Sequence, residues 1–272
     1  MRVPFPLPML PPAALVAATL GVAPVSGATP ACSAHSGRQM VALVELYTSE
    51  GCDSCPPADR WLSSTFAPGQ DNEGAVALAF HVDYWDRLGW KDRFATAAWT
   101  KRQYDSARAA RSDLVYTPQV LLQGRDLRDW HAETRSGPAI AAAARSPARA
   151  EISLDVAPQS GAVAVNATAH VPTAAQRKGA VLFVALTENG LASDVKAGEN
   201  KGKRLVHDHV VRDLRGDIAI GPAGDGSGTV VLPLPAEAGK APTIVAFVQN
   251  TETGEVLQTL ALPLAAACAP AR

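Results

Sequence analysis

Net charge is nearly absent from this sequence. Its 272 residues carry 25 Lys and Arg against 26 Asp and Glu, which gives a formal net charge of −1 at pH 7. Proteins that bind nucleic acids present a strongly basic face, so we expect no nucleic-acid partner. The balance also gives no reason to expect an acidic partner. The length allows one large core or two modest ones, and two domains are expected.

Long apolar runs are missing after the first 31 residues. Within them Arg2 is the only charge, and Met9–Ala23 is almost entirely Ala, Leu, Val and Pro. Pro12 and Pro24 bracket a run that is too short to span a bilayer. This favours a cleaved secretory signal peptide over a membrane anchor. We therefore expect a secreted or periplasmic protein that has no stable membrane span once residues 1–31 are removed.

Cysteine is scarce, with only four residues in the chain. Export to an oxidising compartment would permit stable disulfides. Cys52 and Cys55 form one natural pair, which leaves Cys32 and Cys268 as a candidate structural disulfide that would close a very long loop. The spacing leaves this second pairing open, because geometry decides whether two cysteines can be bridged.

The stretch Val41–Leu62 reads VALVELYTSEGCDSCPPADRWL. Its apolar start has the density of a strand buried on both faces, and the two prolines after Cys55 suit the first turn of a helix. Cys52 and Cys55 therefore lie where a helix begins, and the free amides and the helix dipole there favour the reactive thiolate. Asp53 opposes this effect, because a carboxylate beside Cys52 disfavours a second negative charge.

Further α/β elements are predicted up to about residue 148. Ala75–Val82 has the apolar content of a strand, so the strand–helix–strand order implies a parallel pair joined by a right-handed crossover. Lys91–Arg111 has a helical pattern with a basic bias, which is more typical of a solvated helix face than of an anion site. Pro118 interrupts the strand-like Val115–Gln123, which indicates an edge strand or a cis peptide bond.

From residue 149 the hydrophobic pattern changes from helical to alternating. Clusters of Gly, Pro, Asn and Asp separate about seven candidate strands, a spacing typical of a β-sandwich. These strands are 151–156, 162–170, 181–187, 205–213, 228–234, 243–249 and 255–262.

The order of strand, CxxC at a helix start, crossover strand and a later Thr-Pro resembles the thioredoxin fold. The resemblance implies that Cys52 is the nucleophilic thiol, that Cys55 is the resolving thiol, and that Pro118 is a cis-proline. With Thr117 before it, Pro118 would hold a substrate segment beside the sulfurs. Asp-Ser replaces the Gly-Pro of thioredoxin between the cysteines, and the stretch from Cys55 to Pro118 is longer, which matches a helical insertion.

A closer resemblance covers most of the chain. The phrases VELYTSEGCDSCPPADRWL, HVDYWDRLGWKDRF, VYTPQV and GENKGKRLVHDHVVR look like a domain-of-unknown-function family of predicted secreted, thioredoxin-like bacterial proteins. This resemblance implies an α/β thioredoxin-like domain with a helical insertion over 32–148, followed by a mainly β, sandwich-like domain over 149–272. It implies no substrate and no activity.

Polar and aromatic residues follow the second strand. His81, Asp83 and Trp85 share one strand face by the period of two, and Asp83 at the strand end is a candidate proton acceptor for Cys55. Tyr84 and Trp85 are candidate substrate-binding residues beside the thiols. The alternatives are a salt-bridging Asp83, a core His81 and aromatic packing between domains.

The function expected from these residues is thiol–disulfide exchange with a protein substrate or redox partner, and no cofactor is expected. One alternative is binding or delivery of zinc or copper through the same cysteines, with His81 and Asp83 as further ligands. No second CxxC and no HxxxH is present, so no metal ligand is assigned. The other alternative is a non-catalytic binding module with a structural disulfide.

A Gly-rich loop and two histidines form the last candidate group. His207 and His209 share a face of one candidate strand, but no third ligand is evident, which favours a structural or interface role over a metal site. The family resemblance also covers the segment that contains Glu199, Asn200 and Arg212, and with the length of the segment it implies that this segment faces the domain that carries the cysteines.

Overall fold

The computed structural model describes residues 32–70, 74–235 and 240–264. The signal peptide predicted over residues 1–31 lies outside this part of the chain. Cys268 also lies outside it, so the pairing of Cys32 with Cys268 stays a prediction. Within the described residues no helix has both the length and the apolar character needed to cross a membrane.

Strands outnumber helices in the described chain. The α-helices are α1 (Pro56–Thr65), α2 (Ala97–Ala109) and α3 (Glu133–Ala144), with short 3-10 turns η1 (Asp86–Leu88) and η2 (Ala174–Gln176). The strands of the first half are β1 (Cys32–His35), β2 (Ala42–Thr48), β3 (Ala75–His81), β4 (Gln119–Leu122) and β5 (Arg125–Asp126). Those of the second half are β6 (Glu151–Gln159), β7 (Ala162–His170), β8 (Ala180–Asn189), β9 (Leu191–Asp194), β10 (Arg204–His207), β11 (Val210–Ala219), β12 (Asp225–Pro233), β13 (Lys240–Asn250) and β14 (Val256–Pro263).

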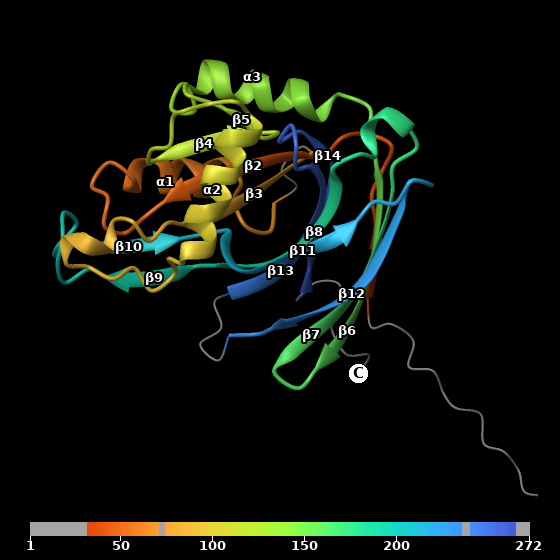
Figure 1. Cartoon of the computed structure of the whole chain (residues 1–272). Coiled ribbons are helices and arrows are strands. Elements are labelled where there is room, and N and C mark those ends of the chain that lie inside the picture. Colours follow the sequence, from red (N-terminus) through yellow and green to blue (C-terminus); the bar gives the residue numbers. More distant parts are fainter. Residues whose placement is uncertain (1–31, 71–73, 236–239, 265–272) are drawn as a thin grey trace, which may run out of the picture.

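Strands from both halves of the chain share one eight-stranded sheet, in the order β14-β13-β8-β11-β3-β2-β4-β5 (Figure 1). β2 and β3 are parallel, with Leu46 opposite Ala79, and β4 runs antiparallel to β2. β11 pairs in parallel with β3 at Val210 and Ala79, and antiparallel with β8. A four-stranded sheet, β1-β6-β7-β12, and the β9–β10 hairpin complete the strand pairing of the described residues.

The prediction of a thioredoxin-like α/β domain followed by a mainly β domain is wrong. Most elements are strands, and the described residues hold no separate α/β core, because the eight-stranded sheet continues through the predicted boundary at residue 148. The physical reason is the edge of β3, where β11 pairs at Ala79 and so covers part of an edge that would otherwise leave backbone groups without a strand partner. The backbone amide of Ala79 donates to the carbonyl of His209 at 2.8 Å. An alternating pattern reports which face of a strand is buried, and not which edge it pairs with.

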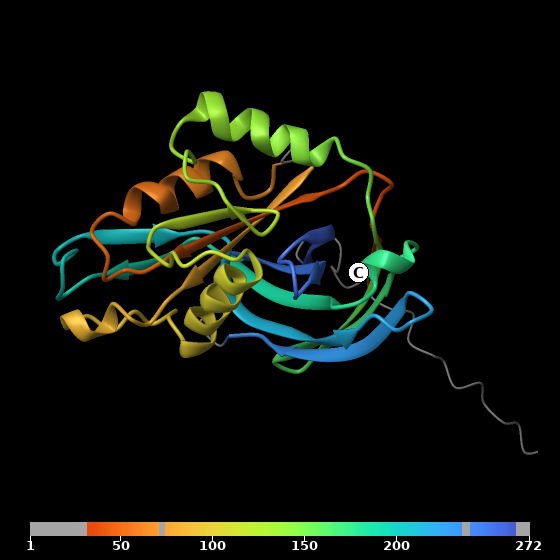
Figure 2. The same cartoon turned by 45° about the horizontal axis from the view of Figure 1, so that its top comes forward.

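Both faces of β2 are covered, as its apolar sequence predicted. Val44 and Leu46 pack against α1 and α3, whereas Leu43 and Tyr47 point to the opposite face, which carries Trp99 of α2. Figure 2 shows the helices on these two sides of the strands. The parallel β2–β3 pair and the helix that begins after Cys55 were also predicted correctly.

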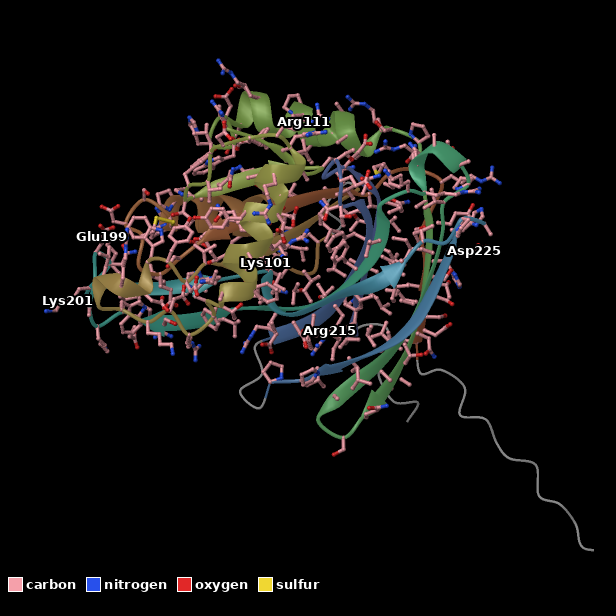
Figure 3. The ribbon with its side chains drawn as sticks, in the orientation of Figure 1. Lys101, Arg111, Glu199, Lys201, Arg215 and Asp225 are labelled. Carbon is pink, nitrogen blue, oxygen red and sulfur yellow. A yellow bond between two sulfur atoms is a disulfide. The ribbon has the colours of Figure 1, made fainter. Side chains whose placement is uncertain are left out.

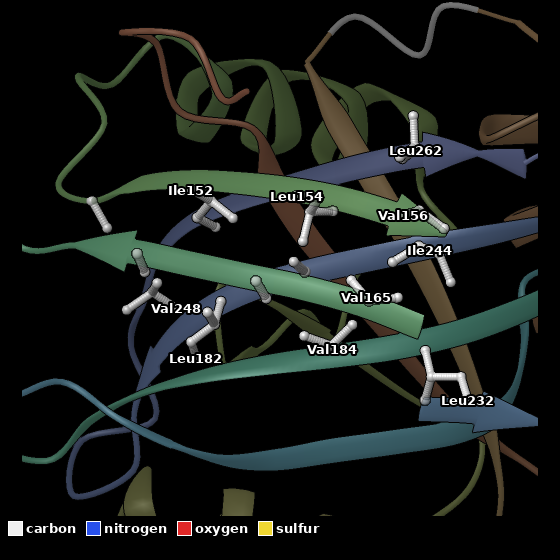
Figure 4. Close-up of a cluster of buried hydrophobic side chains, with 14 of the residues drawn as sticks. Ile152, Leu154, Val156, Val165, Leu182, Val184, Leu232, Ile244, Val248 and Leu262 are labelled. Carbon is white, nitrogen blue, oxygen red and sulfur yellow. The ribbon is translucent and has the colours of Figure 1, made fainter. Parts of the chain in front are cut away.

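The largest apolar cluster lies between the two sheets in the second half of the chain. Ile152, Leu154 and Val165 of the four-stranded sheet meet Leu182 and Val184 of the eight-stranded sheet, as Figure 4 shows. The predicted strand 205–213 is split in two, because His209 has φ of +57° and turns the chain between β10 and β11.

A buried ion pair ties α2 to both halves of the large sheet. Arg102 of α2 donates to Oε1 of the fully buried Glu45 on β2, at 2.9 Å from Nε and 2.5 Å from Nη2. The same guanidinium donates to Gln249 of β13 at 3.1 Å and lies 5.2 Å from the ring centre of Phe247. Arg102 thus neutralises the charge of Glu45 where solvent is excluded.

We predict that Arg102→Met destabilises the fold, because it leaves the carboxylate of Glu45 buried without a partner. Breaking a buried pair in this way typically costs about 3–5 kcal/mol. Arg108→Met is the matched control, since Arg108 lies on the same helix and pairs with Asp105 at the surface, where a pair is worth about 0–1 kcal/mol. Urea unfolding measures both free energies, and equal values for the two variants would contradict the proposed role of Arg102.

Candidate functional site

The cysteine pair forms a disulfide at the start of α1. The Cα atoms of Cys52 and Cys55 are 5.4 Å apart, and neither residue is exposed to solvent. Cys55 is the N-cap of α1, and Pro56 and Pro57 occupy its first two positions. Proline fits there because first-turn amides have no partner inside the helix. The sequence signal for this local structure was therefore reliable.

A hydroxyl pair lies against the sulfur of Cys52. The peptide bond between Thr117 and Pro118 is cis, as the sequence suggested. Thr117 Oγ1 is within donating distance of Cys52 Sγ, at 3.6 Å, and Trp85 Nε1 donates to the same hydroxyl oxygen at 2.7 Å. Ser54 Oγ lies 3.4 Å from Cys52 Sγ. Cys52, Cys55, Thr117, Pro118 and Trp85 thus come together from three separate segments.

Two other predicted site residues are bound to α2. Asp83 accepts a hydrogen bond from Thr100 Oγ1 at 2.6 Å, and its backbone amide donates to the same oxygen. The Tyr84 hydroxyl donates to Gln103 at 3.3 Å, and burial raises the pKa of Tyr84. These hydrogen bonds are not the salt bridge named as the alternative for Asp83, and its role as proton acceptor stays a prediction.

A group of buried ionisable residues lies beside the disulfide loop. Its members are Glu50, Asp59, His81, Asp92 and His207, none more than 6% exposed. Glu50 lies two residues before Cys52, Asp59 lies one helical turn after Cys55, and His81 ends β3. The residues meet only because residues 50–59, the end of β3, the loop that carries Asp92, and β10 lie side by side here.

Hydrogen bonds fix the carboxylates of this group. Asp92 Oδ2 accepts from the Glu50 amide at 2.9 Å and lies 2.6 Å from His81 Nδ1. Thr48 Oγ1 donates to Asp59 Oδ2 at 3.0 Å. Trp90 Nε1 donates to Glu50 Oε2 at 2.7 Å. Each carboxylate is therefore held in place by a neighbour.

His207 lies between two of these carboxylates. Its Nε2 is 3.3 Å from Glu50 Oε1 and its Nδ1 is 3.5 Å from Asp59 Oδ1, both at ion-pair distance but neither in hydrogen-bond geometry. Burial alone would lower the pKa of His207, but Asp59 and Glu50 outweigh it and raise the pKa to about 10. His81 is the nearest ring, with its centroid 4.7 Å away.

Sequence reasoning found only part of this group. It named His81 and His207 but missed Glu50, Asp59 and Asp92. The position of Asp59, four residues after Cys55 on a predicted helix, was an available signal, because such residues share a helix face. Asp92 offered no comparable signal.

His207 and His209 do not share a site, so the metal pair that the sequence had disfavoured is not formed by these two residues. His209 Nε2 lies 2.6 Å from the carbonyl oxygen of Phe66, and burial lowers the pKa of His209. The positive φ of His209 separates it from the strand that carries His207. The structural role that the sequence favoured for His209 agrees with this contact.

The loop between β9 and β10 covers the cysteine loop. Asn200 is fully buried and donates to the carbonyl oxygens of Glu50 at 2.9 Å and of Cys52 at 2.8 Å. Glu199 Oε2 accepts from the Asp53 amide at 3.1 Å. Figure 3 shows Glu199 and Lys201 at this end of the molecule. Glu199 and Asn200 therefore lie against the part of the chain that carries the cysteines, as expected. Arg212 binds Glu188 instead, at 2.5 Å.

A pocket of about 690 Å³ lies elsewhere, between α2 and the strands of the second half of the chain. Trp99, Arg102, Leu214 and Gln249 are among its lining residues, and none of the residues around the disulfide lines it. The candidate site is therefore identified by the reactive residues around the disulfide, and not by this pocket.

We predict that Asn200→Ala speeds reduction of the Cys52–Cys55 disulfide by dithiothreitol about tenfold. The variant removes two hydrogen bonds that hold the loop over the cysteines, each worth about 0.5–1.5 kcal/mol, and about 1.4 kcal/mol corresponds to a factor of ten in rate. Lys201→Ala, in the exposed part of the same loop, is the control and should react like the native chain. An unchanged rate for Asn200→Ala would show that this loop does not limit access.

Comparisons with known proteins identify relatives of this chain. Residues 43–249 match the model of the family described as "Protein of unknown function (DUF1223)". Among solved structures, protein AGR_C_4864 from Agrobacterium tumefaciens is 25% identical with a TM-score of 0.54, over 87% of this chain and 98% of that one. HBP35 of Porphyromonas gingivalis is 14% identical with a TM-score of 0.64, over 87% of this chain and 79% of that one, which is a likeness of fold alone. No curated protein matches the chain.

Proposed function

The chain belongs to the DUF1223 family, and we propose that it carries out thiol–disulfide exchange on protein substrates through Cys52 and Cys55. The observation that carries the proposal is the closed disulfide at the first turn of α1, with the Thr117 hydroxyl 3.6 Å from Cys52 Sγ. A CxxC pair in this setting has the elements of a reversible redox couple: two sulfurs that can form a disulfide, and neighbouring groups that stabilise a thiolate.

The proposed reaction begins from the reduced pair. The Cys52 thiolate attacks one sulfur of a substrate disulfide, which forms a mixed disulfide and releases one substrate thiolate. The Cys55 thiolate then attacks Cys52 Sγ, which restores the Cys52–Cys55 disulfide and releases the second substrate thiolate. Two electrons pass to the substrate, each released thiolate takes a proton from solvent, and the reverse sequence oxidises a substrate dithiol.

The surroundings of Cys52 support its role as the attacking thiol. The hydroxyls of Thr117 and Ser54 lie beside its sulfur and can donate to a thiolate, which lowers the free energy of the charged form. The positive end of α1 acts in the same direction. Asp53 acts in the opposite direction through its negative charge, so we expect moderate and not extreme activation.

Access to the sulfurs is part of the proposal. Both cysteines are buried, whereas the two residues between them, Asp53 and Ser54, are exposed. A substrate would approach from the side of these residues and of Thr117, after the loop held by Asn200 has moved. Exchange of this kind suits an oxidising compartment, which is the secreted or periplasmic location that residues 1–31 predict.

We predict that Cys55→Ser accumulates mixed disulfides with protein substrates, because the second thiol needed to release them is gone. Cys52→Ser is the matched control and should trap none, since Cys55 would not make the first attack. The full chain is expressed with each substitution, and adducts are identified by mass spectrometry after non-reducing electrophoresis. Adducts with Cys52→Ser alone would reverse the assigned roles, and none with either variant would contradict the proposed exchange.

A further inference from the structure

Three buried side chains point donor atoms at one another beside the disulfide loop. Asp59 of α1, His81 of β3 and His207 of β10 each offer one such atom, and these atoms lie within 4.8 Å of one another. None of the three residues is more than 6% exposed. We propose that Asp59, His81 and His207 bind one divalent transition-metal ion, with zinc as the best fit.

The orientation of His81 leaves a free lone pair in this group. Asp92 Oδ2 lies 2.6 Å from His81 Nδ1, and Asp92 Oδ1 is fixed by the Phe94 amide at 2.9 Å. Nδ1 must donate to this carboxylate, which puts the lone pair of a neutral ring on Nε2. His81 Nε2 is buried and has no hydrogen-bond partner. A carboxylate behind a histidine is the arrangement that orients metal ligands in proteins.

His207 also has a carboxylate behind one ring nitrogen, at ion-pair distance and without hydrogen-bond geometry. Its Nε2 faces Glu50 Oε1 at 3.3 Å, and Trp90 holds the other oxygen of that carboxylate. Its Nδ1 faces Asp59 Oδ1 at 3.5 Å, and neither ring nitrogen has a hydrogen-bond partner. Each of the two histidines therefore turns one nitrogen to a supporting carboxylate and one toward the shared space.

Asp59 supplies the third donor. Thr48 occupies its Oδ2 through a hydrogen bond of 3.0 Å, and its Oδ1 faces His207. Donors that are each about 2.0–2.2 Å from a tetrahedral zinc ion are about 3.3–3.6 Å apart, and the 3.5 Å separation of Asp59 Oδ1 from His207 Nδ1 falls in this range. The three donor atoms lie within 4.8 Å of one another, so His81 has to move closer for all three to reach this separation.

The charge of the group also favours a cation. Glu50, Asp59 and Asp92 bring three carboxylates into a buried region that also contains His81 and His207. The three carboxylates outnumber the two histidines, buried charge that is not fully neutralised is costly, and a divalent ion between the histidines and Asp59 would offset it. Two histidines and one carboxylate are ligands of zinc and of iron(II), and this set uses neither cysteine.

Metal binding to the full chain tests the proposal. The protein is treated with EDTA, dialysed and titrated with ZnCl2 by calorimetry, with separate titrations of Mn²⁺ and, without oxygen, of Fe²⁺. We expect one zinc ion per chain and a higher Tm in its presence. Asp59→Asn, His81→Gln and His207→Gln should each weaken binding at least tenfold. Preferred binding of Fe²⁺ at the same residues would retain the site and change its metal.

Two controls separate this site from other ligands. His170→Gln alters a histidine that lies at the surface beside Asp225 and should leave zinc binding unchanged. The double variant Cys52→Ser, Cys55→Ser should also bind one zinc ion, which makes the result independent of the proposed exchange reaction. Loss of zinc from the double variant would overturn the assignment in favour of a thiolate site.

X-ray absorption on the native chain covers the case in which the buried variants fail to fold. A zinc shell of nitrogen and oxygen with two histidine rings, and no sulfur, is the expected spectrum. Failure of the native chain to bind one equivalent of Zn²⁺, Mn²⁺ or Fe²⁺ would overturn the proposal and leave His207 as a protonated partner of Glu50 and Asp59. A sulfur-containing shell would overturn it as well.

Discussion

The rest of the structure depends on a short parallel contact between β3 and β11. Val210 lies opposite Ala79, and the Ala79 amide donates to the carbonyl of His209 at 2.8 Å. Since β10 and its preceding loop lead directly into β11, this contact fixes where His207 and Asn200 lie. It joins the two halves of the chain in one sheet and brings the second half against the cysteine loop of the first.

The disulfide consequently has two different surroundings. On its outer side are exposed Asp53 and Ser54, together with the Thr117 hydroxyl. On its inner side are buried carboxylates and histidines, which reach it through Glu50 and through Asp59 on α1. The same ten residues, 50–59, therefore carry the proposed exchange reaction and part of the proposed metal site. A change in the loop between β9 and β10 would affect both proposed activities, because Asn200 donates to the backbone carbonyls of Glu50 and Cys52.

Local features were predictable from the sequence, and the joining of the two halves was not. Pro56 and Pro57 after Cys55 marked the start of a helix, and the Thr117–Pro118 step marked a special peptide bond; both depend on neighbouring residues alone. The pairing of β11 with β3 depends on which edges meet, which an alternating pattern does not encode. For the same reason His207 was recognised as a histidine of interest, but its meeting with Asp59 and Glu50 was missed.

The central claim is that Cys52 and Cys55 form an exchanging redox couple rather than a structural crosslink. The most direct measurement is the reduction potential of this pair in the full chain, equilibrated in glutathione or dithiothreitol buffers and read by alkylation and mass spectrometry of the peptide that contains both cysteines. A reversible two-electron transition with a midpoint between about −270 and −120 mV, the range of disulfide-exchange proteins, is the predicted result. A pair that stays oxidised until below about −300 mV, as structural disulfides do, would contradict the claim.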